Sequence, residues 1–255
     1  MTTFINIVRN RILNITTLLM MTLPLSSCAQ TPEKQQENVV NPKNEASQKT
    51  MKIGVIGAGS LGGTVGKLLV KAGYNVMFSS RHPEELKEMA KELGSLASVG
   101  TSKQAAAFGD VLLFAVPYDA IPQLGQDLKD EIKGKIVLDA CNGGSGDLGE
   151  EVKAKGNGPT SAKYLANTRL VRVFSSEDAT AVDASFDRNG ENKLAIPLAG
   201  DDQEAREIAA QLVRDVHCDP VIVGDLSTGV KFQRATPAFR ANTNAVELRR
   251  LLGSK

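Results

Sequence analysis

The chain has 255 residues, 42% of them hydrophobic and only 4% aromatic, and its 30 basic and 29 acidic side chains leave a formal net charge of +1. Both signs are interspersed, so no basic stripe indicates nucleic-acid binding. Of the three cysteines, Cys141 and Cys218 have no metal-binding or redox spacing, and we expect them to be free thiols.

The third cysteine, Cys28, ends a segment with the pattern of a bacterial lipoprotein signal peptide. Arg9 and Arg11 are the only charged residues before Glu33, and an apolar run shorter than a membrane span of ~20 residues follows them. Residues 25–28, Leu-Ser-Ser-Cys, resemble a lipobox, in which the cysteine is lipidated. An uncleaved signal anchor or a plain secretory signal is the alternative. We therefore expect a lipid-anchored protein of the cell envelope, at the outer membrane or the periplasmic face, and a cytoplasmic one if the leader is not used.

The next segment, residues 29–50, is polar and has no aromatic residue. Such a segment cannot bury enough apolar surface to fold. We interpret it as a disordered tether between the signal peptide over residues 1–28 and a folded domain over residues 51–255.

A glycine-rich turn at the start of this domain is the most informative feature of the chain. Gly57, Gly59 and Gly62 form a GxGxxG motif between a short apolar strand and a stretch with helical spacing of apolar residues. In a dinucleotide fold these glycines allow the tight turn, the approach of the pyrophosphate and close helix packing, in that order. The N–H groups around Ser60 and Leu61 then face the phosphates. An ordinary glycine-rich turn is the alternative, but the strand, helix and second strand around it favour a nucleotide site.

The end of the second predicted strand, residues 74–78, indicates which dinucleotide binds. NAD-specific sites usually have an acidic residue here, whereas this chain has Ser80 and Arg81. A hydroxyl and a guanidinium bind a 2′-phosphate, which a carboxylate would repel. The sequence therefore predicts NADP(H), unless Arg81 is a solvated residue at the start of a helix before Pro83.

Strands and helices alternate as far as residue 142, which predicts an α/β fold with a doubly wound, mostly parallel sheet of the Rossmann type. Three later strands predict a small C-terminal α/β extension. Because ligands bind at the carboxyl ends of such strands, we expect Val116, Pro117 and Asn142 to line the nicotinamide site. The further expected strands are 97–99, 111–116, 135–140, 170–174, 194–198 and 220–223, and the expected helices include 83–93, 103–108, 120–128 and 244–252.

Three local expectations complete the domain. Residues 143–160 are polar and glycine-rich, and we interpret them as a mobile loop. The helix that follows the strand at 194–198 is expected to begin with Asp201 as its cap and Glu204 completing a capping box. Val246 is expected to join the apolar, core-facing stripe of the last helix.

These motifs together resemble the NADP-dependent oxidoreductases of the coenzyme F(420) (8-hydroxy-5-deazaflavin) type, a family of predicted dinucleotide-binding reductases. The resemblance implies a single compact domain with the nicotinamide and its acceptor near Pro117 and Asn142, and a 2′-phosphate held by Ser80 and Arg81. Ser175 stands where members often have Asn or His. The matching segments are GAGSLG at 57–62, SSR at 79–81, AVPYDAI at 115–121, DACN at 139–142, VRVFSS at 171–176, LAGDDQEA at 198–205 and DPVIVGDLS at 219–227.

No acid–base catalyst is evident, and we assign no catalytic residue. Tyr74, Tyr118 and Tyr164 lack the lysine four residues later that short-chain dehydrogenases use, His82 lies at the 2′-phosphate end, and His217 is expected to be a helix-end residue. Hydride transfer between two stacked rings needs no protein acid. We therefore expect a deazaflavin, flavin or quinone-like acceptor as co-substrate of NADP(H).

Two alternatives stay open. An imine reductase similar to pyrroline-5-carboxylate reductase should have an all-helical second half, against which the strands near residues 194 and 220 argue. A non-catalytic nucleotide-binding lipoprotein would explain an exported chain. The expected partners are a small-molecule acceptor and, through the lipid anchor alone, a membrane; no metal and no nucleic acid is expected, and a homodimer is left open.

Cys28 is predicted to be the site of lipidation. Labelled palmitate fed to a bacterial expression host should enter the intact protein and a Cys141→Ser control, but not Cys28→Ser, as measured by autoradiography of the purified chains. Label retained in Cys28→Ser would contradict the lipobox.

Overall fold

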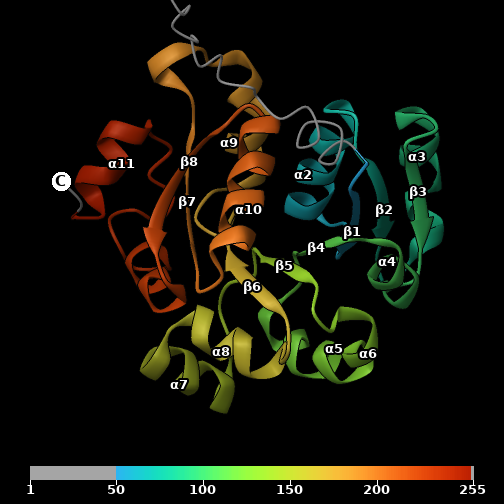
Figure 1. Cartoon of the computed structure of the whole chain (residues 1–255), viewed down its shortest axis with the longest axis horizontal. Coiled ribbons are helices and arrows are strands. Elements are labelled where there is room, and N and C mark those ends of the chain that lie inside the picture. The colour runs from blue at the N-terminus through green and yellow to red at the C-terminus, as the bar shows by residue number, and fades with distance from the viewer. Residues whose placement is uncertain (1–49, 254–255) are drawn as a thin grey trace, which may run out of the picture. The chain divides into compact units, whose positions relative to one another are not determined.

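A computed structural model describes residues 50–253 (Figure 1). The predicted signal peptide with Cys28, and the predicted tether except Thr50, lie outside these residues. Within residues 50–253, no helix is both long enough and apolar enough to cross a membrane.

The described residues form an eight-stranded sheet in the order β3-β2-β1-β4-β5-β6-β7-β8. Neighbouring strands are parallel except for β6 and β7, so β7 and β8 run against the other six. This confirms the expected doubly wound fold with a C-terminal α/β extension. The strands are β1 (Lys52–Ile56), β2 (Asn75–Ser79), β3 (Ala97–Gly100), β4 (Val111–Phe114), β5 (Ile136–Asp139), β6 (Arg169–Arg172), β7 (Ala195–Gly200) and β8 (Asp219–Gly224).

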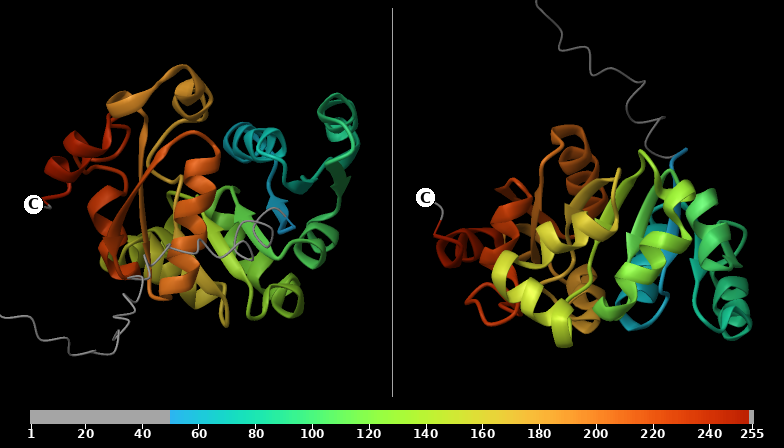
Figure 2. Two further views of the ribbon diagram at one scale, coloured as in Figure 1. Left: turned by 45° about the horizontal axis from the view of Figure 1, so that its top comes forward. Right: turned by 90° about the horizontal axis from the view of Figure 1, so that it is seen from below.

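Helices cover both faces of the sheet, and Figure 2 gives two further views of this arrangement. Side chains alternate between the faces: Val111 and Leu113 of β4 pack with α2, α9 and α10, whereas Leu112 and Phe114 pack with α4, α5 and α8. A third cluster joins α11 to β7 and β8. The α-helices are α2 (Ser60–Lys71), α3 (Lys87–Leu93), α4 (Ser102–Phe108), α5 (Ile121–Asp127), α6 (Lys129–Ile132), α7 (Gly146–Lys155), α8 (Asn157–Tyr164), α9 (Ala179–Asp183), α10 (Gln203–Asp215) and α11 (Ala245–Leu251).

The register of the parallel strands places one row of residues at the carboxyl edge of the sheet. Ile56 pairs with both Ser79 and Phe114, Phe114 pairs with Asp139, and Asp139 pairs with Arg172. The order of strands reverses between β1 and β4, and a crevice for a ligand is expected at such a switch point. The segments that follow this row therefore converge on one site.

The expectation of a mobile loop over residues 143–160 is wrong, because residues 146–164 form α7 and α8. Leu148 and Val152 of α7 pack against the core, which holds this helix in spite of its polar composition. The half-buried Glu151 carboxylate accepts hydrogen bonds from Lys163, Lys155 and Tyr164. These bonds, that from Lys163 most of all, lower the pKa of Glu151 to about 2. Tertiary contacts stabilise these two helices, because the intrinsic helix propensity of a glycine-rich segment is weak.

Two helix details also differ from the expectation. Asp202 rather than Asp201 caps α10, since the Asp202 side chain accepts the Ala205 N–H at 2.8 Å, and Asp201 instead accepts the Leu226 N–H. Val246 is 73% exposed on α11 and does not belong to the core. His217 follows α10 with a φ of 66° and donates its N–H to the Arg214 carbonyl, so it is a helix-end residue as expected.

Candidate functional site

The glycine-rich turn lies at the crevice between β1 and β4. The N–H groups of Gly57 and Ala58 donate to the Ser79 carbonyl at 3.1 and 2.7 Å, which ties the turn to the end of β2. Gly59 precedes α2 and caps it through its backbone carbonyl, with no side chain over the helix end. The N–H groups of the first turn of α2 are therefore directed toward the crevice, where they can bind phosphate oxygens.

Each glycine of the motif meets a different constraint. Gly57 has a φ of 96°, and a Cβ atom there would lie 2.6 Å from the Ala115 carbonyl oxygen. A Cβ on Gly62 would overlap the Gly57 carbonyl oxygen and lie 3.0 Å from the Ala115 Cβ, so this glycine lets α2 pack closely on β1 and β4. A Cβ on Gly59 would meet no protein atom within 4 Å. The fold itself thus leaves room for a side chain at Gly59, and a bound pyrophosphate fits the open space there.

The two serines at the end of β2 have different roles. The Ser79 hydroxyl is buried and donates to the Val55 carbonyl at 2.7 Å. Ser80 and the exposed Arg81 instead line a cavity of about 620 Å³ that runs from the glycine turn to the segment after β4. The cavity is lined by Gly57, Ala58, Gly59, Ser80, Arg81, Ser102, Ala115, Val116, Pro117, Asp119, Ala120, Gln123 and Leu124.

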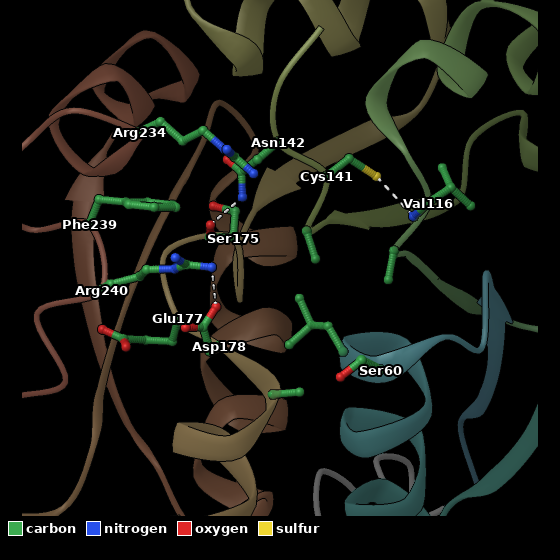
Figure 3. Close-up of a pocket in the computed structure, with 14 residues that line it drawn as sticks. Ser60, Val116, Cys141, Asn142, Ser175, Glu177, Asp178, Arg234, Phe239 and Arg240 are labelled. Atoms are coloured by element: carbon green, nitrogen blue, oxygen red, sulfur yellow. Dashed lines mark hydrogen bonds and ion pairs between the residues drawn. The ribbon is translucent and has the colours of Figure 1, made fainter.

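A second cavity, of about 270 Å³, adjoins the first, with Ala115 and Val116 lining both (Figure 3). Ser60 and Leu61 line it from α2, and Asn142 lines it from the end of β5. The two cavities together thus bring in nine of the ten predicted cofactor residues, and the tenth, Gly62, lies in the helix packing behind the turn. The wall facing α2 is formed by Ser175, Glu177, Asp178, Arg234, Phe239 and Arg240.

A buried ion pair holds the floor of the second cavity. Arg172 and Asp139 are both fully buried, and Arg172 Nη1 donates to Asp139 Oδ2 at 2.9 Å. The same guanidinium donates to the Cys141 carbonyl and to Asn142 Oδ1, and the Asp139 carboxylate accepts the Cys141 N–H at 3.0 Å. Asn142 also donates to the Ser175 carbonyl, so its side chain joins the ends of β5 and β6.

Two residues near the predicted nicotinamide site have structural roles. The Tyr118 hydroxyl is buried, donates to the Asn157 carbonyl at 2.8 Å and lies 3.0 Å from Ser161 Oγ, and burial raises its pKa to about 12. Tyr118 therefore supports α8 and does not line either cavity. Burial likewise raises the pKa of the Cys141 thiol well above its ordinary value, and both Cys141 and Cys218 are free and buried, as expected.

The residues of the far wall of the second cavity were not among the site residues predicted from the sequence. Arg234, Phe239 and Arg240 belong to a connecting segment with no regular periodicity, so only their clustering as basic and aromatic residues marked them. Glu177 and Asp178 lie in the segment that follows β6, on the side of the sheet where parallel strands present ligand-binding residues. Arg172 had a visible signal, because an arginine inside a buried apolar strand requires a partner.

NADP(H) fits these residues. The space above Gly59 leaves room for a pyrophosphate against the first turn of α2, and Ser80 and Arg81 provide a hydroxyl and a cation at the same cavity.

Comparison with known proteins identifies a related family. Residues 52–143 match the family model described as NADP oxidoreductase coenzyme F420-dependent. These residues are therefore similar to that family. The resemblance stated from the motifs is thereby confirmed, and the chain carries an NADP-dependent oxidoreductase domain.

The chain is also similar in sequence to two reductases. It is 27% identical over 213 residues to the F420-dependent NADP reductase of Methanothermobacter marburgensis, covering 73% of this chain and 90% of the relative. It is 26% identical over 207 residues to metalloreductase STEAP3 of Rattus norvegicus, covering 78% of this chain but only 40% of that relative.

Solved structures share the fold. A hypothetical protein from Sinorhizobium meliloti matches with a TM-score of 0.66 at 23% identity, over 77% of this chain and 97% of the other. A pyrroline-5-carboxylate reductase from Coxiella burnetii matches with a TM-score of 0.53 at 18% identity, over 74% of this chain and 66% of the other.

Gly59→Val should abolish NADPH binding while leaving the thermal unfolding temperature nearly unchanged. The added side chain meets open space in the protein but occupies the region expected for the pyrophosphate. Calorimetric titration and thermal unfolding would measure both effects. Unchanged NADPH affinity in the folded variant would show that the cofactor does not lie on this turn.

Arg81→Ala should weaken NADPH binding by about 1.5–3 kcal/mol, the range for a hydrogen bond to a charged group, and leave NADH binding almost unchanged. Titration of the unmutated protein and the variant with both cofactors measures this difference. Lys87→Ala, which removes an exposed cation of α3 outside both cavities, is the control. Equal affinities for NADPH and NADH in the unmutated protein would contradict the assignment of Ser80 and Arg81.

Proposed function

We propose that the protein transfers hydride between NADP(H) and a planar ring acceptor of the deazaflavin, flavin or quinone type. The observation that carries this proposal is the continuity of the two cavities at Ala115 and Val116, opposite the ring of Phe239. When bound, the nicotinamide supplies the hydride, and the chain's residues orient the two rings and exclude water.

The lining of the second cavity supports this chemistry because it offers no tyrosine, lysine or histidine. Its two carboxyl groups are engaged with the protein. Asp178 forms an ion pair with Arg240 at 2.7 Å, and the Glu177 carboxylate accepts the Asn242 N–H at 3.1 Å. A ring acceptor that takes hydride directly requires neither group as an acid.

An imine reductase is the second candidate, and Glu177 is the observation that favours it. Glu177 is only 6% exposed, and burial raises its pKa to about 7, which suits a proton donor. Against this candidate, β7 and β8 extend the sheet where an all-helical second half is expected.

We also propose that the protein is exported and anchored to a membrane of the cell envelope through a lipid on Cys28. The support for this location is the basic, apolar leader and the Leu-Ser-Ser-Cys sequence at residues 25–28. Whether the anchored protein is an enzyme or only binds a nucleotide is decided by turnover of NADPH in the purified protein.

Removing the carboxyl groups should matter less than adding bulk to the second cavity. We expect Glu177→Gln and Asp178→Asn each to retain most of the rate of NADPH oxidation with flavin, deazaflavin or quinone acceptors. Ala179→Phe places a large ring in this cavity alone and should lower the rate by about 10²-fold, as misplaced reactants do, without weakening NADPH binding.

Stopped-flow absorbance at the NADPH band, together with NADPH titration of each variant, separates these effects. Loss of turnover in Glu177→Gln with its NADPH affinity intact, or turnover of a cyclic imine but of no ring acceptor, would replace the stacked-ring reaction by an imine reduction.

A further inference from the structure

Arg234 lies between two hollows of the protein. It lines the second cavity, where the acceptor is expected, and also a neighbouring hollow of about 260 Å³. That hollow is lined by Gly143, Gly144, Gly149, Val152, Lys153, Asn157, Gln233 and Arg234. A ligand that extends from the acceptor cavity toward α7 would therefore pass the Arg234 guanidinium.

Arg234 and Arg240 are the two cations that line the second cavity. Of these two, only Arg234 has no ion pair within the described residues. Arg240 pairs with Asp178 at 2.7 Å, whereas Arg234 contacts only the ring of Phe239, 5.9 Å from its centroid, among the interactions seen in residues 50–253. Lys153 adds a second positive charge in the neighbouring hollow, although it pairs with the exposed Glu150. This end of the site therefore favours an anion.

A buried hydroxyl provides an independent sign of a ligand in the acceptor cavity. Ser175 lines this cavity and is 2% exposed, and its Oγ has no hydrogen-bond partner within the described part of the chain. Figure 3 places Ser175 beside Asn142, on the wall that carries Arg234 and Arg240. A buried hydroxyl without a partner is costly, and a polar group of a bound ring would satisfy it.

The segment that carries these cations is held in an unusual backbone conformation. Ala235, Arg240 and Asn242 have φ values of 67°, 58° and 47°, which non-glycine residues seldom adopt. The Arg240 N–H donates to the Ser176 carbonyl at 2.7 Å, which fixes the segment against the end of β6. Such backbone strain is concentrated at ligand clamps.

The hollow beyond Arg234 has a defined floor. The Asn157 N–H donates to Gln233 Oε1 at 3.3 Å, and Asn157 Nδ2 donates to the Gly143 carbonyl at 3.2 Å. Asn157 is 4% exposed, so these contacts join α8, the end of β5 and the Arg234 segment in one buried connection.

We propose that Arg234 decides acceptor specificity, by binding an anionic group on the side chain of the ring acceptor. The ring lies between the nicotinamide end of the first cavity and Phe239, with a polar ring atom at Ser175, and the side chain extends past Arg234 toward Lys153. This inference rests on the proposed hydride transfer and adds to it the residue that decides acceptor specificity.

The test uses FMN and riboflavin, which share one ring system and differ by a phosphate. Quenching of flavin fluorescence measures the Kd of each for the NADP-saturated protein. We expect FMN to bind about tenfold more tightly, the effect of one exposed charge-assisted contact, with the difference shrinking at high salt. Arg234→Gln should bring the ratio of the two Kd values close to one, and Arg234→Lys should restore part of it.

Lys231→Gln is the matched control, because it removes the same charge from an exposed residue nearby that lines neither hollow. This variant should keep the full preference for FMN. Equal Kd values in the unmutated protein, no binding of either flavin, or a preference that survives Arg234→Gln would overturn the inference. Selective FMN binding that depends on Arg234, with no NADPH oxidation by any ring acceptor, would support the anion site and refute the proposed reaction.

Discussion

The buried ion pair between Asp139 and Arg172 is the constraint on which the floor of the second cavity depends. A charge removed from water is stable only beside an opposite charge, so loss of either partner from such a pair lowers the free energy of unfolding by about 3–5 kcal/mol. Here the pair does more than neutralise charge, because its remaining hydrogen bonds reach the Cys141 backbone and the Asn142 carboxamide. The chain after β5 is thus held against the end of β6 by contacts within the protein, and these contacts form the floor of the second cavity.

The nucleotide end depends on a different constraint, the close approach of backbone to backbone. Gly57 and Gly62 are required by the protein itself, because Ala115 and the Gly57 carbonyl leave no room for side chains. Gly59 is free of this requirement. One turn therefore contains two glycines that the packing of the fold requires and a third, at the N-cap of α2, that faces open space.

The reversed direction of β7 and β8 shapes the far wall of the second cavity. Because β7 and β8 are antiparallel to the other strands, the chain leaves β8 at the edge of the sheet opposite to the carboxyl ends of β1 to β6. The chain then returns along the sheet, and the Thr243 carbonyl accepts the N–H of Ala195 at the start of β7. This return brings Arg234 and Phe239 to the carboxyl edge of β6, across from the glycine turn.

The sequence by itself determined the nucleotide half: the strands, the glycine turn, the end of β2 and the doubly wound sheet. These features are encoded in contiguous residues, through periodicity and through glycines with local backbone demands. Only the tertiary structure decided that residues 146–164 are helical, that Asp202 caps α10, and that Val246 is exposed. It also decided the wall of the second cavity. The contact of Arg172 with Asn142 depends on the pairing of β5 with β6, and the position of Arg234 depends on the packing of a connecting segment against the end of β6. Both arise from contacts between segments distant in sequence, which no local pattern records.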